Sequence, residues 1–169
     1  MPEATQQVPR SFRSILFHGA VCGAIGAGTI AVWFFLVDAM AGQPLATPMS
    51  LGGALLGDTL PAWQVLLGYS ALHLGMFIVI GTVAATLVAS TERAPSMLFA
   101  MVPLFVMLEV VIHVFTGLVA APLLGSLAWL NIVVGNFIAA FVAGSYLWQR
   151  YPHIRSTLAR QPLGVPTDR

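Results

Sequence analysis

The chain has 169 residues, of which 58% are hydrophobic and only 8% are charged, and its mean hydropathy is +0.89. An average soluble domain carries about 25% charged residues, so this composition excludes an ordinary soluble protein and predicts an integral membrane protein. The net charge is +1 and the seven basic residues are all arginine and scattered, so no dense basic face exists. Nucleic acid is therefore not expected as a partner.

Apolar segments long enough to cross a bilayer recur along the chain, since a transmembrane helix needs about 20 residues. We predict an all-α membrane protein with four transmembrane helices in a bundle, which forms one membrane domain over 15–149. A cytoplasmic tail, 1–14, precedes this domain, and a basic cytoplasmic tail, 150–169, follows it. The predicted spans are, in chain order, about 15–40, 63–89, 95–119 and 124–148.

The distribution of arginine predicts the orientation. Placing both termini in the cytoplasm puts every arginine on the cytoplasmic side, including Arg93 between the second and third spans, as the positive-inside rule requires. Arg10 and Arg13 before the first apolar segment are also compatible with a secretory signal. The run from Ile15 to Val37 is longer than the 7 to 15 residues typical of a signal, so we predict an uncleaved helix and a multi-pass protein of the cell inner membrane.

Small residues recur every third or fourth position in the first and last spans, which lets another helix backbone approach closely. Cys22 lies among them, and as the single cysteine it excludes an internal disulfide. We therefore predict tight helix crossings on these faces. The residues expected to pack there are Gly19, Gly23, Gly26, Gly135 and Ala139.

The segment between the first two spans contains a short helix pattern. Thr47 as N-cap and Pro48 at the first helical position predict a helix that ends near Leu56, which is too short to cross a membrane. We expect this helix to lie at the extracytoplasmic interface of the bilayer. Asp38, which ends the first span, is expected near the surface, and His18 at the cytoplasmic end is expected to be interfacial or solvated.

Polar side chains occur inside the spans, where an ionisable residue is costly enough to suggest a functional site. Measured from the span ends at about 1.5 Å per residue, they share one layer in the outer half of the membrane. The members of this predicted polar layer are Tyr69, His73, Glu109, His113 and Asn131.

Three interpretations of the layer remain open. His73 and His113, with Glu109, could hold a haem or a metal ion, because imidazole suits iron, copper and zinc. The layer could instead serve as a proton or quinone site. In the third interpretation the side chains only hydrogen-bond between helices and bind no cofactor. No Ser/His/Asp set and no His-Glu-x-x-His spacing is present, so we predict no catalytic residue and no fixed-spacing metal motif.

The segment Val32–Asp38, followed by Gly42–Pro48, resembles one found in small bacterial four-helix membrane proteins to which no activity is assigned. The resemblance implies a four-helix architecture and a location in the bacterial inner membrane. It implies no catalytic residue.

The sequence thus favours a non-catalytic accessory or structural subunit of a larger membrane complex, such as a respiratory or photosynthetic electron-transfer assembly. Its expected partners are the lipid bilayer and other membrane-protein subunits. The alternatives are a small haem-, metal- or quinone-binding membrane protein that uses His73, His113 and Glu109, and an oligomeric small transporter. Absorbance and metal analysis, or a flux assay in liposomes, would separate these alternatives from a subunit that only packs.

Overall fold

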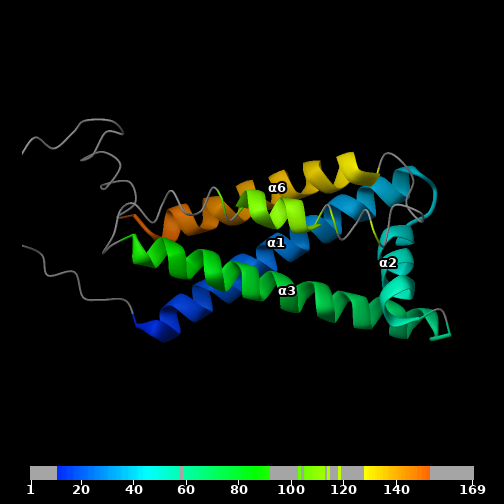
Figure 1. The fold of residues 1–169 in the computed structure, drawn as a ribbon, viewed down its shortest axis with the longest axis horizontal. Helices are drawn as coiled ribbons and strands as arrows, with labels where there is room; N and C mark the ends of the chain where they lie inside the picture. The colour runs from blue at the N-terminus through cyan, green and yellow to red at the C-terminus, as the bar shows by residue number, and fades with distance from the viewer. Residues whose placement is uncertain are drawn as a thin grey trace, which may run out of the picture.

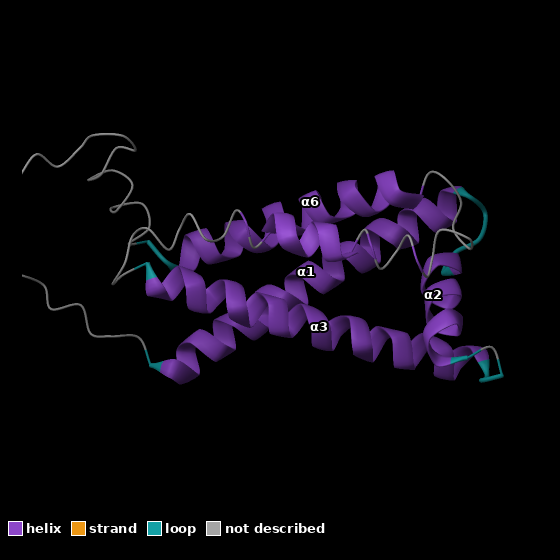
Figure 2. Cartoon of the chain, in the orientation of Figure 1, coloured by secondary structure: helices purple, strands orange, loops and turns teal. Residues whose placement is uncertain are grey.

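The computed structural model describes residues 11–57, 59–91, 103, 105–112, 114, 118 and 128–152, and these residues are helical apart from short connections. Figure 2 shows helices and loops and no strand in this part of the chain. Three of the helices are long and apolar enough to cross a membrane, so the prediction of a helical membrane protein is confirmed. The labelled helices are α1 (Phe12–Met40), α2 (Ala46–Leu56), α3 (Ala62–Ser90) and α6 (Ala128–Arg150) (Figure 1).

Helix α1 is the centre of the described bundle. It packs against α3 on one side and α6 on the other, whereas α3 and α6 make little contact with each other. Both α3 and α6 run antiparallel to α1, and α2 lies across the end of the bundle where α1 finishes and α3 begins (Figure 1). Residues 105–112 are also helical; the rest of the predicted third span lies largely outside the described residues.

Glycines bring the backbones of α1 and α3 into direct contact. A Cβ atom built on Gly19 would lie 2.5 Å from the Cα of Thr82, and one on Gly23 would lie 2.6 Å from the Cα of Ile78. On the opposing helix, a Cβ on Gly81 would collide with the backbone of both Gly19 and Gly23. Only glycine permits this crossing, which is typical of helices that pack in lipid through small residues.

A tryptophan joins α1 to α6. The indole N–H of Trp33 donates a hydrogen bond of 2.9 Å to the carbonyl oxygen of Asn131. A Cβ on Gly135 would lie only 2.7 Å from Cδ1 of the same indole. Gly135 therefore provides the space in which the ring reaches the α6 backbone.

Replacing Trp33 by phenylalanine should remove this hydrogen bond while keeping most of the ring packing. One neutral hydrogen bond contributes about 1 kcal/mol, so we expect a fall of roughly 2–4 °C in the thermal unfolding midpoint of the detergent-solubilised protein. The matched control is Trp63→Phe, because Trp63 is 62% exposed. An equal fall in both variants would contradict the role given to the Trp33 bond.

The short helix α2 begins earlier than predicted and is capped differently. It starts at Ala46, after Leu45 in a left-handed conformation with φ of 72°, so Thr47 is within the helix and is not its N-cap. The carboxylate of Asp38 takes the capping role: Oδ2 accepts from the backbone N–H of Thr47 and Oδ1 accepts from its hydroxyl, each at 2.7 Å.

Asp38 is consequently buried within the protein, with 6% of its surface exposed, while its predicted depth near the membrane surface stays a prediction. The first N–H groups of a helix have no partner within the helix, and a carboxylate supplied from α1 satisfies one of them. The same bonds hold the start of α2 against the end of α1. The other side of α2 packs on α3, since a Cβ on Gly52 would lie 2.6 Å from Cγ1 of Val65.

Candidate functional site

Three aromatic side chains form a ladder along one face of α3, at consecutive turns of the helix. The rings of Tyr69 and His73 are stacked, with centroids 5.8 Å apart and an interplanar angle of 10°. His73 then meets Phe77 edge-on, with a centroid distance of 4.8 Å and an angle of 75°. All three side chains are half-buried.

The ladder begins at the glycine crossing and extends toward α2. A Cβ on Gly26 would lie 3.0 Å from Cδ1 of Phe77, so Phe77 packs at the crossing itself. Beyond it α1 and α3 separate, and α2 spans the wider end (Figure 1). His73 and Tyr69 therefore lie on the part of α3 between the glycine crossing and α2.

Glu109 lies on the helical segment 105–112. Phe105 packs edge-on against Phe137 of α6, with centroids 5.5 Å apart, and Glu109 is one turn further along its helix. Glu109 is half-buried, and its predicted place in one layer with His73 stays a prediction.

Two members of the predicted polar layer remain, His113 and Asn131. His113 lies outside the described residues. Asn131 makes its interhelical bond through its backbone carbonyl, which accepts from Trp33. Asn136 was not included in the layer, yet its side-chain Nδ2 is buried and has no hydrogen-bond partner among the described residues. The burial of this side-chain nitrogen is what the sequence does not reveal.

No group of three histidine, cysteine, aspartate or glutamate side chains able to hold a metal ion is found within the described residues. The prediction that His73, His113 and Glu109 bind a cofactor stays a prediction.

A second polar cluster lies near the other end of the bundle, where α1 begins and α6 ends. A hydrogen bond of 2.8 Å joins His18 Nδ1 to the hydroxyl of Tyr146, and the guanidinium of Arg150 lies 5.6 Å from the centre of the Tyr146 ring. His18 also meets the ring of Tyr151 edge-on. His18 is thus half-buried and bonded across helices, and the expectation that it is interfacial or solvated did not include this bond. His18 and Tyr146 are 128 residues apart in the sequence, so no local sequence pattern predicts their hydrogen bond.

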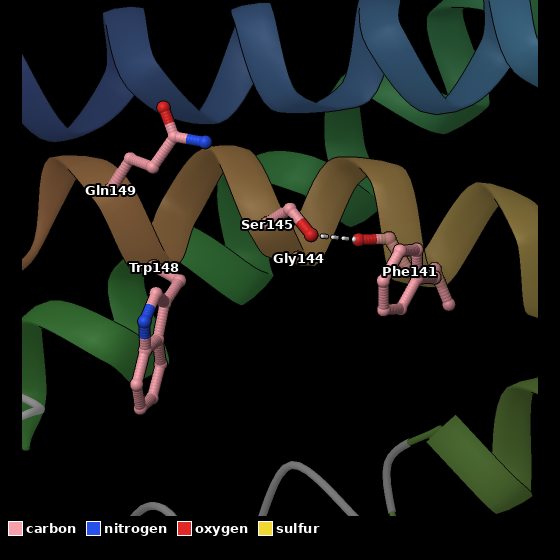
Figure 3. Close-up of a pocket in the computed structure, with 6 residues that line it drawn as sticks. Phe141, Gly144, Ser145, Trp148 and Gln149 are labelled. Atoms are coloured by element: carbon pink, nitrogen blue, oxygen red, sulfur yellow. Dashed lines mark hydrogen bonds between the residues drawn. The ribbon is translucent and has the colours of Figure 1, made fainter.

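A shallow, open depression of about 460 Å³ lies on α6, and Figure 3 shows the residues that line it. Its floor lies near Gly144, where an added Cβ would meet no atom within 4 Å. The Ser145 hydroxyl in it donates to the carbonyl of Phe141 at 2.7 Å, so the hydroxyl is engaged within its own helix. None of the lining side chains is ionisable, which gives the depression no catalytic group. The lining residues are Ala140, Phe141, Gly144, Ser145, Trp148 and Gln149.

The fold and these sites define a helical membrane protein with tightly packed glycine crossings and polar side chains placed within its helices. Comparison with known proteins finds no matching family model, no similar curated protein and no similar solved structure.

Proposed function

We propose that this chain is a non-catalytic accessory or structural subunit of a larger membrane complex, which it joins through the outer face of α1. The observation that carries the proposal is a row of small residues on that face. Ala24, Gly28 and Ala31 are all exposed, and their spacing places them on one side of the helix. Phe17, 65% exposed, and Phe35, 48% exposed, lie on the same side at either end of the row.

The row is unlike the inward glycines of α1, because no helix of the described part of the chain packs closely against it. A Cβ on Gly28 would meet no atom within 4 Å. Glycine in a helix costs about 1 kcal/mol relative to alanine, and a lipid-facing position gains no packing in return. A row of small residues between two larger aromatic ones matches the surface that a second transmembrane helix needs for a close crossing.

The host complex that best fits this role is an electron-transfer assembly of a bacterial inner membrane, respiratory or photosynthetic. Within the described residues no group of three histidine, cysteine, aspartate or glutamate side chains able to hold a metal ion is found, and α1 presents a row of exposed small residues. A subunit of this kind contributes packing surface and leaves the chemistry to its partners.

The proposal includes four spans and cytoplasmic termini. Helix α3 ends at the same end of the bundle at which α1 begins, and α6 begins at the opposite end (Figure 1). The chain between Thr91 and Ala128 must therefore return along the length of the bundle, and helical residues 105–112 belong to this return. With Arg13 and Arg150 at one end, the positive-inside rule places that end in the cytoplasm and α2 at the extracytoplasmic interface.

Replacing Gly28 by leucine should block the docking face without disturbing the fold, because the new side chain enters open space. We expect the tagged wild-type chain, extracted gently from its own membranes, to migrate in a large particle with stoichiometric partners identified by mass spectrometry. The Gly28→Leu variant should lose most of the co-purifying partners. Each 1.4 kcal/mol of packing free energy lost at the interface weakens the association about tenfold.

The matched control is Gly75→Leu, because Gly75 is an exposed glycine of α3 with equally open surroundings. It should keep the wild-type particle. Recovery of the wild-type chain alone, or only with copies of itself, would overturn the proposed role, and so would equal loss of partners in both variants.

A further inference from the structure

Polar side chains in the described helices mostly find partners within the protein. Five hydroxyls donate to the carbonyl four residues earlier in their own helix, at 2.7–2.8 Å. In lipid this arrangement satisfies a group that water cannot reach. The residues that do so are Thr29, Thr82, Thr86, Ser90 and Ser145.

Tyr69 and His73 depart from this pattern. Their rings contact each other and Phe77, but neither the phenol nor the imidazole makes a hydrogen bond to any residue that the structure describes. Their polar atoms lie one turn apart on the same helix face. A hydroxyl or ring N–H without a partner in an apolar medium costs on the order of 2 kcal/mol or more, so two such groups side by side offer a favourable binding site to a molecule that carries hydrogen-bond acceptors into the bilayer.

The depth of the pair limits what that molecule can be. The exposed Trp63 at the start of α3 is placed as an interfacial anchor. At about 1.5 Å per residue, Tyr69 then lies about 9 Å and His73 about 15 Å beneath Trp63, inside the hydrocarbon. Phospholipid headgroups and ester carbonyls remain near the interface, and water is scarce at this depth. The molecule must carry its polar group into the apolar core.

The surroundings also limit its shape and its entry. At the outer end, the Cβ of Tyr69 is 3.2 Å from the position of a Cβ on Gly52, so α2 covers this end of the ladder. At the inner end Phe77 closes it against Gly26. On α3, Leu72 and Met76 beside the ladder are exposed. Among the described residues, the approach that stays open is lateral, from the lipid, and a flat ring fits beside a face made of three aromatic side chains.

We propose that Tyr69 and His73 form a two-point hydrogen-bonding site for the carbonyl oxygens of a flat, lipid-soluble molecule of the quinone class. The Tyr69 hydroxyl donates to one carbonyl, the N–H of neutral His73 donates to the other or to the same oxygen, and Phe77 packs against the ring. The proposal concerns binding alone and goes beyond the docking role, because it holds whether or not α1 joins another subunit.

The test uses the purified full-length chain in nanodiscs made from a diester phosphatidylcholine or from its diether analogue. The probe is a benzoquinone with a decyl chain, and its binding is followed by quenching of tryptophan fluorescence. We expect saturable binding to the wild type in both lipids. Tyr69→Phe and His73→Phe should each weaken it about five- to tenfold, the value of one hydrogen bond, while His73→Gln, which keeps a donor, should retain part of the affinity.

Tyr146→Phe is the matched control, because it makes the same chemical change at the far end of the bundle and should leave quinone binding unchanged. Circular dichroism of each variant verifies that it is folded. Quenching that does not saturate, or equal affinity in the wild type and the Tyr69→Phe, His73→Phe double variant, would overturn the proposal.

An ester carbonyl is the other source of the same chemistry. If Tyr69→Phe lowers thermal stability in the diester discs and not in the diether discs, the occupant is phospholipid and the quinone assignment is wrong. Gly28→Leu should bind the quinone normally, so failure of the docking proposal and failure of this one give different results.

Discussion

Replacing Gly81 by valine should prevent α1 and α3 from packing and remove most of the folded protein. The Cβ alone would collide with the backbone of Gly19 and Gly23, and backbone atoms cannot move aside as the tip of a flexible side chain can. Overpacking in a core that can adjust costs about 1–3 kcal/mol, and here the whole helix contact must open, so we expect a larger loss.

The measurement is the yield of monodisperse protein after extraction, together with the thermal unfolding midpoint of whatever remains. Gly75→Val is the matched control: it makes the same change on the same helix at a position with open surroundings, so the same helix propensity is lost without a collision. If Gly81→Val and Gly75→Val behave alike, the direct backbone contact between α1 and α3 is not needed for folding.

Asp38→Ala should be the second most damaging change. It removes both bonds to Thr47 and leaves the N–H in the first turn of α2 buried without an acceptor. Hydrogen bonds to a charged group contribute about 1.5–3 kcal/mol, so we expect a loss of about 3 kcal/mol and a fall in unfolding midpoint of roughly 6–12 °C.

Two further variants separate the contributions. Thr47→Val removes only the hydroxyl bond and should cost roughly half as much, while Asp38→Asn keeps one acceptor oxygen and should fall between wild type and Asp38→Ala. The unfolding midpoints in one detergent give the order directly. An Asp38→Ala variant as stable as Thr47→Val would show that the bond to the backbone N–H contributes nothing.

Sequence predicted the long helices well because each depends on a simple and strong physical signal. About 20 consecutive apolar residues are enough to identify a span, and the starts of α1 and α3 lie within three residues of the predicted ones. The glycine spacing in the first span likewise indicated a close-packed face. It could not indicate the partner: Gly81, Ala85 and Ala89 form a similar row of small residues in α3, but the spacing alone does not say which helix faces it.

The start of α2 was missed because its cap comes from outside its own sequence. Local rules assign the cap to the nearest suitable side chain, which is Thr47, whereas the acceptor is the carboxylate of Asp38 nine residues earlier. The same limit applies to His18, whose partner Tyr146 is on another helix. Depth along a span can be counted from the sequence, and so Tyr69 and His73 were placed in a polar layer. Which of their atoms find hydrogen-bond partners depends on the packing angle between helices, which the sequence does not reveal.

Helices α1 and α3 cross at Gly19, Gly23 and Gly81, closer to one end of each helix than to the other. Each helix therefore extends further on one side of the crossing. The longer part of α1, from Gly23 to Asp38, measures about 22 Å. A rotation of about 5° about the glycine crossing would move the Asp38 end of α1 by about 2 Å, while residues beside the crossing would hardly move. Helix α2 is bonded to α1 by Asp38 and packs on α3 through Gly52. It therefore fixes the angle between α1 and α3, and with it the spacing of the two helices beside Tyr69 and His73.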